Sequence, residues 1–202
     1  MINSTVLPEL KALAPAGFYV AMRVGFAYPV EEQNDFPEAW VQRYTERGLM
    51  LQDPVMHWVY MNSGTVRWSA IPGEDPRGVL RQAAKYGLKY GATVCCVDEG
   101  SAQQRSFGSF GRADREYLDH EIDTLFEAIQ ALHITMRPPT NLTNAELEAL
   151  RMVKNGLLMK EIADMLKVSE GAVKQRLKNA KIKLKAKTST HAATMATSFG
   201  LI

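Results

Sequence analysis

The stretch LTNAELEALRMVKNGLLMKEIADMLKVSEGAVKQRLKNAKIKLKAKT, residues 142–188, predicts three consecutive helices with marked ends. Thr143 and Glu146 have the spacing of a capping box, in which a hydroxyl and a carboxylate each accept an unpaired backbone N–H. Gly156 is expected to adopt the left-handed backbone conformation that ends the first helix. Ser169 is the predicted N-cap of the third helix. These local signals predict a small all-α unit.

The third of these helices is predicted to have one apolar and one basic face. Its apolar residues recur at helical spacing and form one buried stripe: Val173, Leu177, Ala180 and Leu184. The opposite face then carries Lys174, Gln175, Lys178, Lys181 and Lys185. A short turn followed by such a helix predicts a helix-turn-helix that enters the major groove. A lysine-rich face that is merely solvated is the alternative, but it would not need the capping signals.

The charge distribution also points to a nucleic-acid partner. Residues 142–202 hold 11 Lys/Arg against 5 Asp/Glu, whereas residues 1–141 hold 13 against 17. Such asymmetry is typical of a module that binds a polyanion, so we expect double-stranded DNA as partner. The prolines of MRPPTN, 136–141, interrupt helix formation. We therefore predict domains at 1–136 and 142–202, joined by a linker at 137–141.

The N-terminal domain mixes strands and helices. Predicted strands lie at 17–28, 65–71, 92–97 and 105–110, the last two forming a hairpin-like pair, and predicted helices lie at 37–47, 76–90 and 115–136. The last helix is expected to point Leu118, Ile122, Leu125, Phe126, Ile129 and Leu132 inward. The fold class is α+β, with an N-terminal α/β/α sandwich around an antiparallel sheet and a small all-α helix-turn-helix domain.

Several function classes are disfavoured by composition. No apolar run approaches the ~20 residues of a membrane span, and no secretory signal is visible, so a cytoplasmic protein without membrane contact is expected. Cys95 and Cys96 fall in a β-type apolar run and are predicted to be buried on opposite faces. The four histidines lack metal-ligand spacing and no nucleophile motif occurs, so we expect no metal, cofactor or catalytic site. A lactone hydrolase is a hypothesis with little support.

The segment FPEAWVQRYTERGLMLQDPV, residues 36–55, combines amphipathic aromatics with a carboxylate. Trp40 and Tyr44 are four residues apart and share one helix face. Asp53 follows a short apolar run and precedes a proline. Taken singly, the two aromatics are typical of a core, and Asp53 is typical of a turn.

The C-terminal stretch resembles the DNA-binding domain of the LuxR/GerE family, with matches at Glu146, Leu150 and Gly156 in the pattern LTxxExxxL…G. The resemblance covers residues 142 to about 202. It implies that the third helix contacts bases, that other lysines meet phosphates, and that relatives dimerise through a last helix at about 189–198. The resemblance implies that Lys174, Gln175 and Lys178 contact bases and that Lys160 meets a phosphate. Lys181, on the basic face of the third helix, is predicted to neutralise a phosphate.

The N-terminal domain resembles the autoinducer-binding domain of LuxR-type quorum-sensing regulators. The resemblance rests on the spacing of Trp40, Tyr44, Asp53-Pro54, Trp68 and Gly91. It implies a small-molecule ligand of the acyl-homoserine lactone type. In that reading the Trp40 indole donates to the lactone carbonyl, Asp53 accepts the ligand amide N–H, and Trp68 packs over the ring.

Two positions depart from that family pattern. Phe36 stands where relatives often carry a tyrosine hydroxyl, and Val55 stands where some carry threonine. Ser106 or Ser109 on the last strand can supply a replacement hydroxyl. The expected function is a homodimeric quorum-sensing transcriptional regulator; the alternative is a ligand-independent orphan regulator controlled by partner association.

Overall fold

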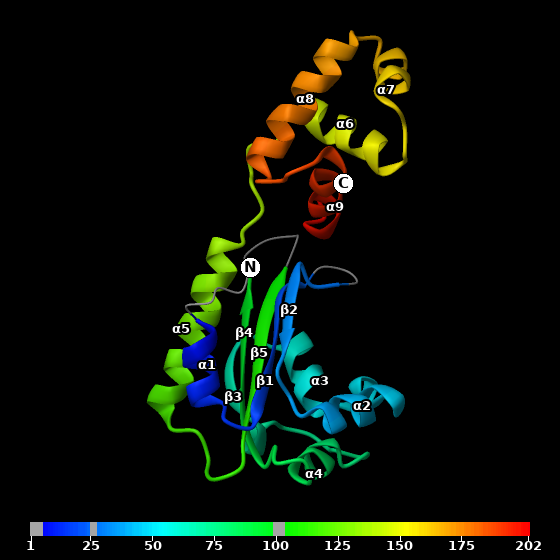
Figure 1. Ribbon diagram of the computed structural model, residues 1–202. Helices are drawn as coiled ribbons and strands as arrows, with labels where there is room; N and C mark the ends of the chain where they lie inside the picture. Colours follow the sequence, from blue (N-terminus) through cyan, green and yellow to red (C-terminus); the bar gives the residue numbers. More distant parts are fainter. Residues whose placement is uncertain (1–5, 25–27, 99–103) are drawn as a thin grey trace. The chain divides into compact units, whose positions relative to one another are not determined.

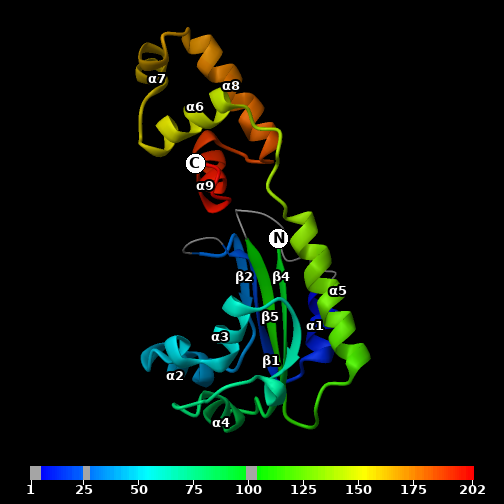
Figure 2. The same cartoon turned by 180° about the vertical axis from the view of Figure 1, so that it is seen from behind.

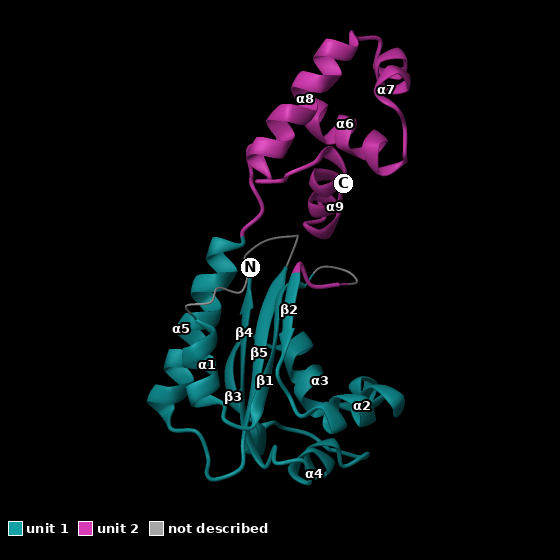
Figure 3. Ribbon diagram, in the orientation of Figure 1, with its two compact units in different colours: residues 1–24, 31–136 teal, residues 25–30, 137–202 magenta. Residues whose placement is uncertain are grey.

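The chain forms two compact units. A computed structural model describes residues 6–24, 28–98 and 104–202 (Figure 1). One unit comprises residues 1–24 and 31–136, and the other comprises 25–30 and 137–202 (Figure 3). The division falls between Met136 and Arg137, at the start of the proline-containing segment. Each unit has its own hydrophobic core.

The first unit is built on an antiparallel sheet in the order β2-β1-β5-β4-β3. The strands are β1 (Gly17–Val24), β2 (Glu31–Asn34), β3 (Gly64–Arg67), β4 (Tyr90–Val97) and β5 (Arg105–Arg112). Strands β4 and β5 pair as predicted, with Thr93 opposite Ser109 and Gly91 opposite Gly111. The predicted turn between them at 99–103, and positions 25–27 of the predicted first strand, lie outside the described residues.

Helices cover both faces of this sheet (Figures 1 and 2). Helices α1 (Leu7–Leu13) and α5 (Asp119–Thr135) pack on one face. On the other side lie α2 (Glu38–Glu46), α3 (Pro54–Met61) and α4 (Val79–Ala84), with two short 3-10 turns, η1 (Leu49–Gln52) and η2 (Trp68–Ala70). The predicted α/β/α sandwich with a central antiparallel sheet is therefore confirmed.

The alternation of strand side chains divides the core between the two faces. Cys96 belongs to the cluster that packs against α5, whereas Cys95 belongs to the cluster beneath α3. Both thiols are free and buried, as predicted. Burial raises the pKa of each thiol to about 11, so both are protonated at neutral pH.

Three local predictions in this unit are wrong. The helix predicted at 76–90 is only Val79–Ala84, because the Asp75 carboxylate accepts the backbone N–H groups of Val79 and Leu80 and starts the helix late. The strand predicted at 65–71 ends at Arg67, where η2 begins. Leu118 is exposed rather than inward, because it occupies the N-cap position that precedes α5.

The described residues of the second unit contain four helices, which correspond to the three predicted helices and to the last helix that the family resemblance implies. Its helices are α6 (Asn144–Lys154), α7 (Met159–Leu166), α8 (Glu170–Lys183) and α9 (Ser189–Ser198). The capping box is present: Thr143 N–H donates to Glu146 at 2.8 Å, and Glu146 N–H donates to the Thr143 hydroxyl at 3.3 Å. Gly156 has φ 81° and ends α6. None of the helices in the described ranges is long and apolar enough to cross a membrane.

Candidate functional site

Five aromatic side chains gather on the α2–α4 side of the sheet, and we call them the aromatic cluster: Phe36, Trp40, Tyr44, Trp68 and Tyr86. Trp40 and Tyr44 project from the same face of α2, with ring centroids 5.5 Å apart in an edge-on arrangement. Tyr86 lies 5.6 Å from Trp40 on another side. The four-residue spacing on α2 therefore directs both side chains into one space, as predicted.

Asp53 joins the aromatic cluster through Tyr44. It is the N-cap of α3, where its Oδ1 accepts the Val55 N–H at 2.8 Å. The Tyr44 hydroxyl donates to Oδ2 at 2.7 Å. Burial raises the pKa of the Asp53 carboxyl, although these two hydrogen bonds oppose the rise. Burial and the neighbouring Asp53 also raise the pKa of Tyr44, so its hydroxyl remains a donor.

Trp68 is placed by a glycine on the neighbouring strand. A Cβ on Gly91 would lie only 2.1 Å from the Trp68 ring, so the indole can lie against β4 only because residue 91 has no side chain. The Trp68 indole N–H donates to the Thr93 hydroxyl at 3.0 Å, and that oxygen lies 3.3 Å from Ser109 Oγ. Trp68 therefore sits on a short polar row across β4 and β5.

The two candidate serines lie on opposite faces of the sheet. Ser109 shares the face of Trp68 and Thr93. Ser106 instead faces α5, where its Oγ is 2.7 Å from His133 Nδ1 and accepts the Arg23 backbone N–H at 2.9 Å. The prediction that Ser106 supplies a hydroxyl to the aromatic cluster is therefore wrong, because the register of β5 turns Ser106 toward α5. Of the two serines, Ser109 is the one that faces the side of the sheet where the aromatic cluster lies.

Ser106, His133 and Asp98 form a row of the residue types found in hydrolases. His133 Nε2 lies 3.2 Å from Asp98, and the Arg23 guanidinium binds both Asp98 and the His133 carbonyl. A nucleophile must reach its substrate, but Ser106 is fully buried and its oxygen already accepts a backbone hydrogen bond. The arrangement therefore ties the end of α5 to the sheet.

The remaining predicted ligand residues also lie at the aromatic cluster. Val55 is buried there, and Phe36 is half-buried against it. Sequence reasoning missed Tyr86, Leu88 and Thr93, which contribute to the same place. Thr93 carried a usable signal, because it is the only polar side chain in the apolar run ATVCCV.

In the second unit, α8 presents the predicted basic face. Val173, Leu177, Ala180 and Leu184 are buried, which confirms the predicted stripe. Ser169 caps the helix by accepting the Ala172 N–H at 3.2 Å. The predicted DNA-binding residues Lys174, Gln175 and Lys178 are exposed on α8, Lys160 is exposed in the first turn of α7, and Lys181 is half-buried.

One lysine of α8 has an internal role. Lys183 donates to both carboxylate oxygens of Glu146, at 2.9 and 2.8 Å, and to the Asn141 carbonyl at 2.8 Å. Burial alone would raise the pKa of Glu146, but Lys183 and the Thr143 N–H lower it below the usual value. This ion pair joins the start of α6 to the end of α8.

Comparison with known proteins agrees with both halves of the chain. Residues 29–136 match the family described as autoinducer binding domain, and residues 140–196 match the family described as bacterial regulatory proteins, luxR family. Regulatory protein SdiA of Escherichia coli is 29% identical over 182 residues, which cover 84% of this chain and 75% of SdiA. The quorum-sensing regulator RhlR of Pseudomonas aeruginosa is 30% identical over 183 residues, which cover 85% of this chain and 76% of RhlR.

The fold comparison gives the same result. A crystal structure of Escherichia coli SdiA superposes with a TM-score of 0.53 at 25% identity, covering 100% of this chain and 90% of that one. The order of the two matched domains is the order of the two units described above. The chain therefore belongs to the luxR family of bacterial regulatory proteins, with an autoinducer binding domain in its N-terminal unit.

Proposed function

We propose that this protein is a cytoplasmic quorum-sensing transcriptional regulator. Its N-terminal unit binds an acyl-homoserine lactone or a similar amphipathic signal, and a homodimer presents two α8 helices to a two-fold site in double-stranded DNA. The observation that carries the proposal is the pairing of a buried carboxylate with aromatic donors in one unit and a basic, capped helix in the other. Half-sites about 34 Å apart are expected for such a dimer.

Polar groups around the aromatic cluster suit the head group of such a ligand. The indole N–H of Trp40 is a hydrogen-bond donor within the aromatic cluster and can bind a carbonyl oxygen. In its ionised form the Asp53 carboxylate offers about four acceptor positions, and Tyr44 and the Val55 N–H bind one on each oxygen. An amide N–H can therefore bind there.

Ligand binding is expected to increase DNA binding by stabilising the folded N-terminal unit. A ligand that binds only the folded N-terminal unit stabilises it by RT ln(1 + [L]/Kd), which is about 2.7 kcal/mol at ~100 times Kd. The population of folded, DNA-competent dimer rises accordingly.

The first test concerns Asp53. We expect a binding lactone to raise the Tm of the wild-type protein, and Asp53→Asn to weaken lactone binding by about ten-fold or more, since hydrogen bonds to charged groups contribute ~1.5–3 kcal/mol. Asparagine caps helices about as well as aspartate, so the ligand-free Tm should change little. Thermal unfolding with and without lactone measures both quantities. A variant that unfolds early yet keeps the full ligand shift would show that Asp53 only shapes the turn.

The second test concerns the basic face of α8. Lys174→Ala is expected to weaken binding to the specific operator by about 1–3 kcal/mol. Lys181→Ala should weaken binding to specific and random duplexes alike. It should also reduce, by about one, the slope of the logarithm of the binding constant against the logarithm of salt concentration. Fluorescence anisotropy titrations at several salt concentrations separate the two effects. Equal losses on specific and random DNA for both variants would contradict the assignment of Lys174 to base contacts.

The apolar character of two positions favours a second candidate function. Phe36 and Val55 both pack in the aromatic cluster and bring no hydroxyl to it. An orphan regulator that needs no lactone and responds to a protein partner fits this feature. A Tm that stays constant with lactones of every acyl length would favour this candidate over the signal-binding one.

A further inference from the structure

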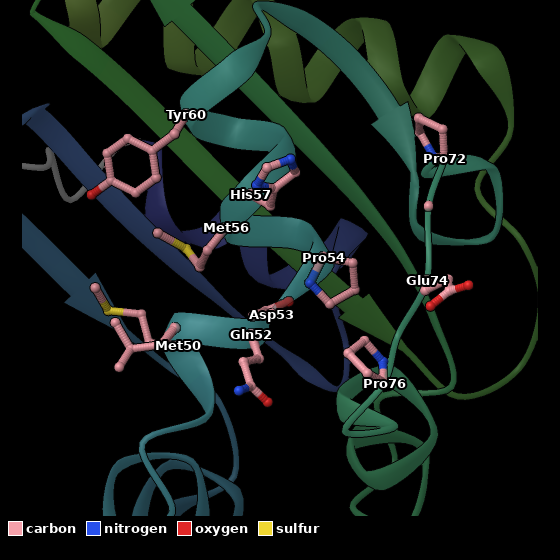
Figure 4. A pocket seen from close by; sticks show the side chains of 12 residues that line it. Met50, Gln52, Asp53, Pro54, Met56, His57, Tyr60, Pro72, Glu74 and Pro76 are labelled. Atoms are coloured by element: carbon pink, nitrogen blue, oxygen red, sulfur yellow. The ribbon is translucent and has the colours of Figure 1, made fainter.

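A groove on the outer surface of the N-terminal unit lies between two walls. Met50, Leu51 and Tyr60, from η1 and α3, line one wall, and the segment 72–76 lines the other (Figure 4). The volume between the walls is about 510 Å³. Leu51 is 88% exposed, and Met50 and Tyr60 are also exposed. Apolar side chains that gather at one exposed place are typical of a surface that a partner covers.

Two arginines stand at one end of this groove. Met50 of the first wall follows Arg47 by three residues, and Pro76 of the second wall directly precedes Arg77. The Arg77 guanidinium donates to the Arg47 backbone carbonyl at 3.4 Å, so the two walls meet there. Both arginines are exposed. The apolar groove therefore ends at a pair of cations.

The positive charge continues from Arg77 along α4. Residues 76–90 contain Arg77, Arg81, Lys85 and Lys89 and no aspartate or glutamate, although the N-terminal unit as a whole holds more acidic than basic residues. Arg81 and Lys85 are four residues apart, so they share one side of α4, and both are exposed. The rim of the groove thus extends into a basic strip.

Uncharged groups hold the guanidinium groups of this strip in place. Arg43 Nε donates to Gln82 Oε1 at 2.9 Å, and Gln82 Nε2 donates to the Arg77 carbonyl at 2.8 Å. An amide or carbonyl oxygen orients a guanidinium without neutralising its charge. An arginine that is oriented in advance loses less side-chain entropy when it binds a carboxylate through two parallel hydrogen bonds.

The composition of the surface favours a protein over DNA or a lipid surface. Arginine, methionine and aromatic residues are enriched where proteins meet. Glu74 lines the 72–76 wall (Figure 4), and its carboxylate repels the closely spaced phosphates of a polyanion. Leu51 likewise gains nothing from a phosphate backbone. A protein segment with both acidic and apolar side chains matches the arginines and the groove together.

We propose that this surface binds a protein partner through a segment that carries acidic and apolar side chains. The apolar side chains enter the groove, and the carboxylates bind Arg47, Arg77 and Arg81. The inference rests on the second candidate function, control by a protein partner, and gives that partner a place and a chemistry. It does not require a bound lactone.

Two synthetic peptides that differ in one property test the proposal. One alternates glutamate with leucine, and the other has the same length and carries serine in place of leucine. Both are labelled with fluorescein, and anisotropy titrations with the full-length protein give their affinities. The leucine peptide should bind at least about ten-fold more tightly, because it buries apolar surface in addition to its charge contacts. The serine peptide measures attraction to positive charge alone.

Three single variants locate the binding surface. Arg77→Ala should weaken binding of the leucine peptide by about five-fold or more. Leu51→Gln should weaken the leucine peptide by a similar factor and leave the serine peptide unchanged. Lys11→Ala is the charge-matched control, because Lys11 is exposed on α1, which packs on the other face of the sheet, and it should change neither affinity. All three residues are exposed or half-buried, so the variants should keep the Tm of the wild type.

The outcomes separate this surface from the signal-binding function. Equal affinities of the two peptides for the wild type, or an undiminished affinity of the leucine peptide for Arg77→Ala, would overturn the proposal. Random duplex DNA or phosphatidylserine vesicles that lose more affinity than the leucine peptide in Arg77→Ala would assign the strip to a polyanion instead. The lactone-induced rise in Tm is measured on the same variants and should be the same in all of them, so it decides the signal-binding function independently.

Discussion

Replacing Gly91 by alanine is expected to lower the free energy of unfolding of the N-terminal unit by roughly 2–4 kcal/mol. The added Cβ would overlap the Trp68 ring at 2.1 Å, so the indole must leave its place against β4. That movement also breaks the hydrogen bond from the indole N–H to Thr93. Urea denaturation followed by tryptophan fluorescence measures the loss, and lactone titration should show weaker binding in the same variant.

A double-mutant cycle identifies the cause of this loss. If the overlap with Trp68 is responsible, Gly91→Ala should cost little in a Trp68→Ala background, because the alanine then has room. The coupling between the two substitutions should be comparable to the single Gly91→Ala effect. Additive effects would show instead that the strand itself requires glycine at position 91.

Glu146→Ala is expected to destabilise the C-terminal unit by about 2–3 kcal/mol. The substitution removes a buried carboxylate that both caps α6 and pairs with Lys183, and removal of one partner from a buried pair costs about 3–5 kcal/mol. We expect less than that range because Lys183 is partly exposed and can return to water. Glu146→Gln keeps a side-chain acceptor for the cap and removes only the charge. Its loss of stability should therefore be smaller than that of Glu146→Ala, and it measures the contribution of the ion pair with Lys183.

The same ion pair predicts a pH dependence. The pKa of Glu146 is lowered in the folded protein, so its ion pair is fully stabilising above the ordinary value of 4.5 and is lost as the pH falls below 4.5 through the folded pKa. The stability difference between wild type and Glu146→Gln should therefore shrink as the pH falls below the ordinary value of 4.5. Denaturation at several pH values measures it. A difference that stays constant over this range would contradict the role of the charge.

The helix-turn-helix unit was predictable from sequence because its signals are local. The capping pairs lie three residues apart, and the buried stripe of α8 repeats within one helix. Helix α3 was missed because its apolar run PVMHWVYM shows little polar contrast, although Asp53 before Pro54 is an N-cap followed by a proline at the first helical position. Capping signals therefore located helices in this chain, whereas the weak periodicity of PVMHWVYM did not reveal α3.

Four of the five members of the aromatic cluster were predictable, whereas its contacts were not. Helical spacing placed Trp40 and Tyr44 together, whereas the face occupied by each serine depended on the register of β5. A shift of one residue exchanges Ser106 and Ser109 between faces, and no local signal fixes that shift. The contact of Trp68 with Gly91 likewise joins residues that are distant in sequence, so the role of the glycine became visible only in the folded chain.

The hydrogen bond between Tyr44 and Asp53 gives this site a built-in competitor. An arriving N–H binds a carboxylate that already accepts a hydrogen bond from a hydroxyl on the neighbouring helix, so the charge that it meets is partly compensated. Stray metabolites with a single donor therefore gain little from binding there. A molecule that also buries apolar surface gains additional binding free energy. The hydrogen bond between Tyr44 and Asp53 therefore favours an amphipathic signal over small polar metabolites.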